Sequence, residues 1–502
     1  MHTRKLPPFP DLKTFVDYQT GLGNCERIGL PVDVRLEAAE IHRRIIAQGG
    51  PVLRFDEPVC EGSPIPVPLV VNLFGTRERV AAGLGTDMAG LGALGRMMAW
   101  MRSPRPPTTL AEARSAFPAA RSALRSRHRI VRDTVPLVAV PPDLGRLPVQ
   151  TCWPGDAGPL ITWPVVVTRP PGPDNPSAYN LGVYRMQVLD RDRAIIRWLP
   201  MRGGAAHHRE WMRKEAEMPV AVVIGADPAT MLAAVMPAPE GVSELALAGV
   251  VGGRRPDLVA CRSIPLHVPA SAEIVLEGTV SASETAMEGP FGDHTGYYNR
   301  PESFPVFRLR HIRMRQDAVY LSTFTGRAPD EPSVIGDAML EVFKPLLRQQ
   351  LPEVLDIWLP PEACSYRIAV IAIDKRYPGQ ARRVMMGLWS LLPQFTMTKL
   401  LIVIDGDVDI RSWSDVMWAV ATRMDPSRDL VTINRTPIDH LDFASPLPGL
   451  GGKLGIDATR KIGSETTRDW GETLVMDAAT ARRVEDRWNE LFGATSMVGR
   501  AS

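Results

Sequence analysis

The chain has 502 residues, of which 45% are hydrophobic and 23% are charged. This balance is typical of a globular protein of about three domains and excludes an intrinsically disordered chain. The 58 basic and 56 acidic residues leave a formal net charge of +2, so the sequence as a whole has no attraction for nucleic acid and we expect no nucleic-acid partner.

Cysteine spacing and hydropathy indicate the compartment. The five cysteines are widely spaced and form no CxxC pair, which argues against a disulfide framework or a cysteine-ligated zinc site. No apolar run approaches the roughly 18 residues of a membrane-spanning helix, and the N-terminal MHTRKLPPFPDLK lacks the apolar core of a signal peptide. We therefore expect a cytoplasmic protein, for which peripheral contact with the inner face of the cell membrane is still open.

The sequence of the N-terminal third of the chain predicts alternating helices and strands. Asp33 is expected to cap a helix that ends before Gly49. The further predicted elements are strands over 52–55 and 68–74 and helices over 77–101 and 110–126, with a proline-rich linker over 103–109.

The middle of the chain is expected to be rich in strands. Apolar and β-branched runs predict strands over 160–169, 180–189, 193–199, 219–224, 273–277 and 306–313. Helices are expected over 206–217 and 227–235. This pattern favours a β-rich, barrel-like domain.

Helix–strand alternation returns after about residue 330, as in a separate α/β layer domain. The predicted elements are helices over 333–350, 380–392, 413–423 and 478–492 and strands over 367–373 and 398–404. The fold class is therefore mixed α/β, with expected domains over 1–125, 126–328 and 329–502.

Two glycine-rich segments do not qualify as nucleotide-binding loops. Residues 449–455 (GLGGKLG) lack the first glycine and the Ser or Thr of a phosphate loop, so a glycine-rich turn is the preferred interpretation. Gly83-Leu84-Gly85 lacks the third glycine of a dinucleotide fingerprint. The pair His207-His208 is expected to be structural, because adjacent helical side chains point in different directions.

The densest group of chemically active residues lies in segment 284–298 (ETAMEGPFGDHTGYY). Its glycines and its proline exclude a helix and predict a shaped loop. Glu288 and Asp293 bracket this loop, and His294 follows. If both acids face one cavity, burial and mutual repulsion are expected to raise one pKa and leave a proton donor near neutral pH. A polar surface turn is the alternative.

A second group begins at Asn180 and Arg185 in the predicted strand 180–189. Their odd separation places them on opposite faces unless Gly182 introduces a bulge. Arg197 and Arg202 follow, the latter beside two glycines. Arginines next to glycine-rich backbone suit a phosphate or a carboxylate ligand, whereas exposed strand arginines are the alternative.

Taken together, several long segments resemble the UbiD family of decarboxylases that depend on prenylated FMN. The resemblance to its bacterial branch, which acts on 3-polyprenyl-4-hydroxybenzoate in ubiquinone synthesis, is close. The segments are NLFGTRERVA (72–81), CWPGDAGPLITWPVVVTR (152–169), NLGVYRMQV (180–188), RWLPMRGG (197–204), IGADPATML (224–232), EGPFGDHTGYYN (288–299), RMDPSRDLV (423–431) and TPIDHLDFASPLPGLGGKLGIDAT (436–459). The resemblance implies a central split-barrel flavin-binding domain and a C-terminal α/β oligomerisation domain.

The resemblance also implies roles for single residues. Asn180 and Glu244 match the family's Mn²⁺ ligands, whose oxygen atoms suit a hard cation that holds the flavin phosphate, and K⁺ is a further expected ion. Arg185, Glu288 and Asp293 match the catalytic trio, with Asp293 as the proton donor. The positions that match flavin contacts are Val183, Tyr184, Arg185, Arg197, Trp198, Leu199, Arg202 and Gly203.

One position departs from the family pattern. Members often carry a histidine directly before Arg-Gly-Gly, and this chain has Met201 there. A histidine contribution to the metal or flavin site is therefore in question at this point.

The implied reaction is the non-oxidative decarboxylation of 3-polyprenyl-4-hydroxybenzoate to 2-polyprenylphenol, through a covalent adduct with prenylated FMN and protonation by Asp293. A cofactor is needed because no side chain can delocalise the charge that CO₂ leaves behind in the plane of an aromatic ring. The alternative substrate is a small phenolic acid without a prenyl tail. Expected partners are a flavin prenyltransferase as the cofactor source and further copies of this chain, with a hexamer expected.

Two other classes of function are disfavoured. A non-catalytic flavin-binding relative would be expected to lack the catalytic trio, whereas Arg185, Glu288 and Asp293 are all present here. A simple flavin reductase would be expected to carry a dinucleotide loop, which the sequence does not offer.

Overall fold

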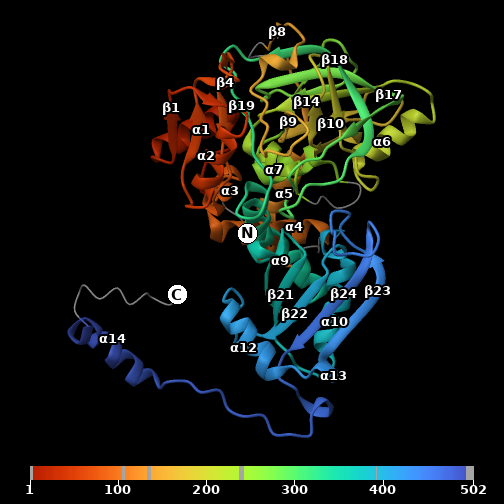
Figure 1. Ribbon diagram of the computed structural model, residues 1–502. Coiled ribbons are helices and arrows are strands. Elements are labelled where there is room, and N and C mark those ends of the chain that lie inside the picture. The colour runs from red at the N-terminus through yellow and green to blue at the C-terminus, as the bar shows by residue number, and fades with distance from the viewer. Residues whose placement is uncertain (1–3, 104–107, 133–136, 237–241, 392, 493–502) are drawn as a thin grey trace. The chain divides into compact units, whose positions relative to one another are not determined.

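The computed structural model describes residues 4–492, apart from 104–107, 133–136, 237–241 and 392 (Figure 1). Contacts divide the chain into two units. The first comprises Met1–Lys375 and Ala381–Thr459, and the second comprises Arg376–Gln380 and Arg460–Ser502.

A small sheet and several helices form the N-terminal part of the first unit. The sheet has the order β1 (Cys25–Ile28), β3 (Val52–Phe55), β6 (Leu69–Val71) and β19 (Tyr320–Leu321). The helices are α1 (Leu12–Gly21), α2 (Glu37–Ile46), α3 (Arg77–Gly83), α4 (Met88–Arg102) and α5 (Leu110–Ala123). The predicted strands and the predicted helix over 110–126 are confirmed, and the helical segment 77–101, which was expected to be interrupted near Gly83 and Gly85, is divided into α3 and α4. Most of the predicted linker over 103–109 lies outside the described residues, and α1 was not expected.

The predicted start of α2 is wrong. Asp33 lies in a short strand, β2 (Val32–Asp33), which belongs to a three-stranded sheet with β4 (Pro58–Cys60) and β5 (Ser63–Pro64). Its carboxylate accepts hydrogen bonds from the backbone N–H groups of Arg35 and Glu61, and Leu36 adopts a φ of 70° before the helix begins. Asp33 therefore holds a turn instead of a helix end.

A large antiparallel sheet forms the centre of the first unit. Its strand order is β11-β10-β14-β17-β18-β13-β12-β9, and β8 (Val138–Val140) adds to β18. The strands are β9 (Leu160–Ile161), β10 (Pro164–Thr168), β11 (Asn180–Val183), β12 (Met186–Val188), β13 (Arg193–Ile196), β14 (Met218–Ile224), β17 (Ile274–Glu288) and β18 (Glu302–Met314). The smaller sheet beside it has the order β16 (His267–Pro269), β15 (Asp257–Ala260) and β7 (Arg129–Ile130).

The link between β11 and β12 closes the central sheet. These strands are consecutive in sequence, yet β11 lies at one end of the strand order and β12 near the other. Only Tyr184 and Arg185 separate them, and three Cα–Cα steps span at most about 11 Å. The two ends of the sheet must therefore meet, which confirms the predicted barrel-like form.

The expectation of a continuous strand over 180–189 is therefore wrong. Gly182 pairs regularly with Val166, so it forms no bulge. A Cβ at Gly182 would lie 2.6 Å from the Tyr184 ring, so this glycine leaves room for Tyr184 to fold back where the strand ends. Arg185 consequently lies at the seam of the barrel.

A second, mostly parallel sheet forms the C-terminal part of the first unit. Its order is β20 (Val354–Trp358), β21 (Ile368–Ile373), β22 (Leu400–Asp405), β24 (Leu450–Ala458) and β23 (Leu430–Pro437), with antiparallel strands at both edges. The helices are α9 (Glu331–Gln350), α10 (Gln380–Leu391), α11 (Pro393–Thr396), α12 (Trp413–Arg423) and α13 (Pro426–Asp429). Apolar residues of α10 and α12 belong to two different buried clusters of this sheet.

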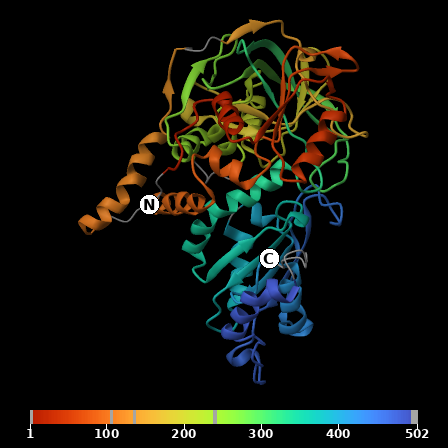
Figure 2. The same ribbon diagram turned by 90° about the vertical axis from the view of Figure 1, so that its left-hand side faces the viewer.

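The prediction of a turn over 449–455 holds only for Gly449, which has a φ of 70°; residues 450–455 form the start of β24. A Cβ at Gly455 would lie 2.5 Å from the Met385 sulfur of α10. The glycines therefore belong to a strand on which a helix packs closely. Helices α4 and α9 also pack against each other (Figure 2). A Cβ at Gly95 of α4 would lie 2.2 Å from the Val342 carbonyl oxygen of α9.

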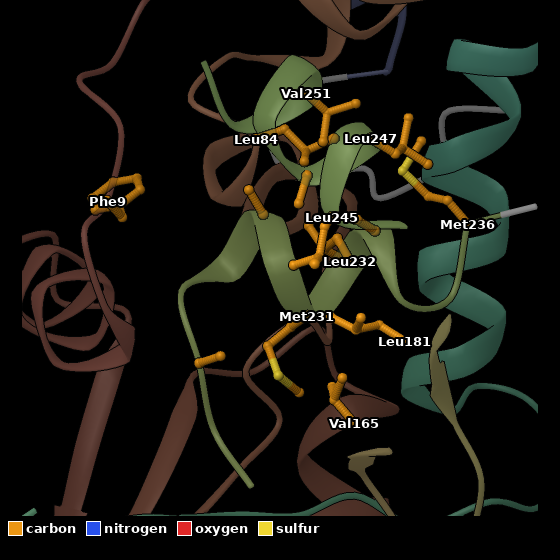
Figure 3. Close-up of a cluster of buried hydrophobic side chains, with 14 of the residues drawn as sticks. Phe9, Leu84, Val165, Leu181, Met231, Leu232, Met236, Leu245, Leu247 and Val251 are labelled. Carbon is orange, nitrogen blue, oxygen red and sulfur yellow. The ribbon is translucent and has the colours of Figure 1, made fainter. Parts of the chain in front are cut away.

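Three short helices flank the central sheet: α6 (Gly203–Met212), α7 (Pro228–Ala233) and α8 (Glu244–Gly252). Apolar side chains of α7 and α8 pack with Leu181 of β11 and Val165 of β10 in one buried cluster (Figure 3). The sequence predicted α6 and α7 but missed α8, whose nine residues are apolar on nearly all sides and show no helical stripe.

The second unit contains α14 (Ala478–Phe492), as predicted, with the Trp488 and Phe492 rings 4.5 Å apart. Within the described part of the chain, no helix has the length and apolar character that crossing a membrane requires.

Candidate functional site

Arg185 joins the two acids that the sequence singled out. Its Nε and Nη2 donate hydrogen bonds to the two carboxylate oxygens of Glu288, at 2.8 and 3.2 Å. Its Nη1 donates to Oδ2 of Asp293 at 2.8 Å. A guanidinium that binds one carboxylate with two parallel bonds is both strongly held and fixed in orientation. The structure thus places Arg185, Glu288 and Asp293 in one cluster.

The two acids come from the hairpin of the long strands β17 and β18. Glu288 is the last residue of β17 and is fully buried, and Asp293 lies in the following loop. Gly289 has a φ of 92°, which disfavours any residue with a Cβ. A Cβ at Gly292 would lie 2.3 Å from Trp153. This is the shaped loop that the sequence predicted.

Two polar residues that the sequence analysis left without a role support this loop. Oδ1 of Asn299 accepts hydrogen bonds from the Phe291 N–H (2.8 Å) and from Nη2 of Arg185 (3.0 Å). Asp156 accepts from the Gly292 N–H at 2.9 Å. Both residues lie in segments that resemble the UbiD family. Their hydrogen-bond partners could not be predicted, because these partners are distant in sequence or depend on the exact backbone path of the loop.

The expectation of a raised acid pKa is wrong for Asp293. Burial alone would raise its pKa, but the hydrogen bond from His294 and the positive charge of Arg185 outweigh burial and lower it to about 2. Because the guanidinium lies between Asp293 and Glu288, attraction replaces the repulsion that we expected. The contacts of Asp293 therefore favour its ionised form.

His294 connects Asp293 to the C-terminal part of the unit. Its Nδ1 lies 2.7 Å from Oδ1 of Asp293, and its Nε2 lies 3.3 Å from Oδ2 of Asp439. Asp439 also accepts hydrogen bonds from Nη2 of Arg367 (3.0 Å) and from the Tyr366 hydroxyl (3.3 Å). The sequence marked His294 but not Asp439, which is 145 residues away.

A second cluster contains the predicted metal ligands. Nδ2 of Asn180 donates to Oε1 of Glu244 at 3.1 Å, and the Leu181 N–H donates to Oε2 at 3.1 Å. The Tyr184 hydroxyl donates to Oδ1 of Asn180 (2.8 Å) and accepts from the Gly204 N–H (3.1 Å). This cluster is linked to the first by the adjacent residues Tyr184 and Arg185.

Packing fixes the separation of Asn180 and Glu244. Each is the first residue of its element, β11 or α8, and is followed by a buried leucine. These leucines, Leu181 and Leu245, belong to the same apolar cluster (Figure 3). The core thus holds the polar pair at its edge.

The chemistry of this pair fits a hard cation. Burial raises the pKa of Glu244, and the groups that donate to its carboxylate, an amide and a backbone N–H, are neutral. A buried carboxylate with only neutral donors favours a positive charge nearby, and oxygen ligands suit Mg²⁺ or Mn²⁺. Among the described residues no group of three His, Cys, Asp or Glu side chains could hold a metal, so a cation at this pair would need ligands of other kinds, such as backbone carbonyls, water or a phosphate.

The neighbouring sulfur and imidazole groups do not complete this donor set. Met201 is 72% exposed, and a thioether is a soft ligand. Nδ1 of His207 lies 2.9 Å from the Thr168 hydroxyl, and Nε2 of His208 lies 3.2 Å from the Ser281 carbonyl oxygen. Both histidines thus have partners elsewhere.

The start of α6 fits an anionic group such as a flavin phosphate. The Arg202 side chain that precedes this ten-residue helix makes no capping hydrogen bond, and of the first N–H groups that of Gly204 donates to the Tyr184 hydroxyl. A Cβ at Gly203 would lie 2.7 Å from the Asn180 side chain, so the helix start reaches the cation pair.

The buried atoms near the seam fit a polar planar ligand. Nε1 of Trp198 and Nη1 of Arg197 are buried and have no hydrogen-bond partner. Nη1 of Arg197 also lies 3.8 Å from Glu288. Of the remaining predicted flavin contacts, Val183 and Leu199 are half-buried, and Arg202 and Gly203 are exposed.

Family models match most of the chain. They are described as domains of 3-octaprenyl-4-hydroxybenzoate carboxy-lyase: the N-terminal domain over residues 18–97, the Rift-related domain over 128–328 and the C-terminal domain over 333–458. The chain belongs to the UbiD family. It is therefore a carboxy-lyase of the UbiD class.

Solved UbiD-class structures match nearly the whole chain. The enzyme HmfF from Pelotomaculum thermopropionicum, in complex with FMN, is 27% identical with a TM-score of 0.77, and the match covers 95% of this chain and 99% of HmfF. An evolved dimeric form of HmfF is in complex with prFMN. The closed form of vanillic acid decarboxylase from Sedimentibacter hydroxybenzoicus is 25% identical with a TM-score of 0.79, and the match covers 96% and 99%.

Proposed function

We propose that this chain decarboxylates an aromatic acid with prenylated FMN, and that Arg185, Glu288 and Asp293 are its catalytic residues. The observation that carries this proposal is the guanidinium of Arg185, which binds both carboxylates at the barrel seam. The adjacent Tyr184 belongs to the Asn180–Glu244 cluster, so cofactor and acid–base groups would share one site.

The polar pair and the start of α6 would hold the cofactor. Asn180 and Glu244 would bind Mn²⁺, with K⁺ as a further ion, and the cation would bind the flavin phosphate. The flavin would lie against Val183, Tyr184, Arg185, Arg197, Trp198, Leu199, Arg202 and Gly203. When bound, prenylated FMN supplies the electron sink that decarboxylation of an aromatic ring needs.

The residues of the chain would orient the substrate and move a proton. The Arg185 guanidinium would be held in place by Glu288 and Asn299, so that it faces the substrate carboxylate in one orientation. Asp293 would deliver a proton to the ring carbon that loses CO₂. A positioned general acid typically accelerates such a step by 10²–10⁴-fold.

The proposed substrate is 3-polyprenyl-4-hydroxybenzoate, and the product is 2-polyprenylphenol in ubiquinone synthesis. The family models that match this chain are described by the 3-octaprenyl substrate, which supports this choice. Such a substrate is insoluble in water, so we also propose peripheral contact with the inner face of the cell membrane. This contact is tested by separating membranes from the soluble fraction at low and at high salt and measuring how much of the protein stays with the membranes.

A small phenolic acid without a prenyl tail is the second candidate substrate. It is favoured by the match to vanillic acid decarboxylase over almost the full length of both chains. We further propose that a flavin prenyltransferase supplies the cofactor and that the chain forms a hexamer, which light scattering can test.

The deciding experiment assays purified holoenzyme with both kinds of acid. CO₂ release from a 3-polyprenyl-4-hydroxybenzoate, with little release from vanillic or 3,4-dihydroxybenzoic acid, supports the first candidate, and the opposite preference supports the second. Mass spectrometry of the released flavin gives an independent check: ordinary FMN in a fully active enzyme would contradict the proposed cofactor.

A further inference from the structure

A continuous chain of hydrogen bonds leaves the candidate proton donor on the side away from Arg185. Oδ2 of Asp293 accepts a hydrogen bond from Arg185, and Oδ1 is hydrogen-bonded to His294. His294 continues to Asp439, which lies just after β23 in the C-terminal part of the unit. The three side chains are largely buried, with the His294 side chain 16% exposed.

The proposed reaction consumes one proton in each cycle. The bond between the ring carbon and the carboxylate breaks, CO₂ leaves, the electron pair stays with the ring carbon, and a new C–H bond forms. The geometry favours the ionised form of Asp293, because Oδ2 accepts a hydrogen bond from the Arg185 guanidinium and Oδ1 lies 2.7 Å from Nδ1 of His294. It therefore has to obtain the proton before it can deliver it.

We propose that His294 stores this proton and passes it to Asp293, and that Asp439 keeps His294 charged between cycles. This inference rests on the proposed function. His294 would act through Asp293 and is therefore a proton-supplying residue, not one that touches the substrate.

The relay moves one proton in two steps. The proton on Nδ1 of His294 moves to Oδ1 of Asp293 over the 2.7 Å hydrogen bond, and Asp293 then passes it to the ring carbon. His294 becomes neutral and keeps the proton on Nε2, which donates to Asp439. One proton from solvent then restores the imidazolium, for which the partly exposed ring offers access.

The groups around His294 favour its charged form. Asp293 is on its own loop, Asp439 approaches from the segment after β23, and Asp330 acts on it from the start of α9. The nearest positive charges do not touch His294: Arg185 binds the far side of Asp293, and Arg367 binds Asp439. The Tyr366 hydroxyl also donates a hydrogen bond to Asp439. Burial opposes the charge, but the hydrogen bonds with Asp293 and Asp439 outweigh it and raise the pKa of His294 to about 10.

A simpler role for His294 would be to hold the two loops together. Other contacts already join the same segments: Nε2 of His440 lies 2.8 Å from Glu302, and the Tyr297 and Phe443 rings pack edge to face at 6.2 Å. His440 is thus a matched control, because it joins the segment after β23 to the start of β18, directly after the loop of His294, but makes its bond to Glu302 and not to Asp293.

The test compares His294→Asn, Asp439→Asn and His440→Asn with the wild-type holoenzyme. For each, kcat and KM are measured from pH 5 to 10, together with bound flavin and thermal unfolding. We expect His294→Asn to lose about 10²-fold in kcat with little change in KM or flavin, because a positioned proton donor typically supplies at least this factor. His440→Asn is expected to match the wild type.

The pH profile of Asp439→Asn separates the proton relay from a purely structural role of His294. Removal of this charge lowers the pKa of His294, so the loss of activity at alkaline pH is expected to begin at least one pH unit lower than in the wild type. An unchanged pH profile in Asp439→Asn, or equal losses in His294→Asn and His440→Asn, overturns the relay. A wild-type holoenzyme that decarboxylates neither kind of acid overturns the proposed function itself, and the relay with it.

Discussion

Arg185 and Glu288 are 103 residues apart in sequence, yet two hydrogen bonds of 2.8 and 3.2 Å join their side chains. Their meeting depends on the break between β11 and β12, which releases Arg185 from the sheet at the point where the barrel closes. The end of β17 places Glu288 opposite. The site is thus a consequence of how the sheet closes.

Replacement of Arg185 by lysine tests the planar fork. Lysine keeps the charge but cannot bind Glu288 through two bonds and Asp293 through a third. We expect Arg185→Lys to lose about 10²-fold or more in kcat/KM, comparable to the loss of one preorganised donor. The control is Arg193→Lys, since Arg193 pairs with Asp190 at the exposed surface. Near-normal turnover in Arg185→Lys would contradict the role of the fork.

Asp293→Asn tests the proposed proton donor. The amide keeps the size of the carboxylate but cannot carry the proton, so we expect kcat to fall by at least 10²-fold. Bound flavin, measured by its absorbance, is expected to stay unchanged because Asp293 is not part of the Asn180–Glu244 cluster. Asp192→Asn in an exposed turn serves as the control. Full activity of Asp293→Asn would exclude Asp293 as the donor.

The sequence predicted the fold class and most elements because apolar periodicity is a local property. It predicted 180–189 as one strand because both halves carry a strand pattern, whereas the partners that separate them, β10 for one half and β13 for the other, are distant in sequence. It missed the strand at Leu450 because glycines usually mark turns, and the helix that packs on Gly455 could not be foreseen.

For the candidate site, too, some features could be predicted from the sequence and others could not. Arg185, Glu288 and Asp293 lie in long segments that resemble a known family, so they could be named before any geometry was available. Asp439 is bound to His294 across 145 residues, and the resemblance named no role for either. The lowered pKa of Asp293 also required the structure, because its sign depends on where the Arg185 guanidinium lies.

Glu244→Gln tests the cation pair. The substitution removes the only formal charge of the Asn180–Glu244 pair but leaves an oxygen and the same shape. Since even indirect partners of metal ligands cost 10–100-fold in metal affinity, we expect at least a tenfold weaker affinity for Mn²⁺. Metal analysis after dialysis against a chelator, together with bound flavin, checks this. Glu210→Gln, exposed on α6, is the control. Equal metal and flavin contents in both variants would argue against a cation at this pair.

Glu331→Gln tests a buried carboxyl group outside the site. Glu331 is the first residue of α9, is fully buried, and accepts a hydrogen bond from the Phe74 N–H at 2.7 Å. Burial raises its pKa to about 7. The neighbouring His42, with Nε2 3.6 Å from Glu331, gives no compensating charge, because burial lowers its pKa to about 3.

The sign of the effect follows from this raised pKa. A carboxyl group that binds its proton more tightly in the folded state stabilises the fold fully below about pH 4.5, and this stabilisation is lost as the pH rises through about 7. Glutamine keeps the acceptor for Phe74 without the charge, so at pH 8 Glu331→Gln should raise the free energy of unfolding by about 1–3 kcal/mol. At pH 4.5 the variant and the wild type are expected to unfold at similar temperatures. Thermal unfolding at both pH values checks this, with Glu57→Gln as an exposed control. A Glu331→Gln variant that is less stable than the wild type at pH 8 would mean that the ionised carboxylate, through Arg79 nearby, stabilises the fold instead.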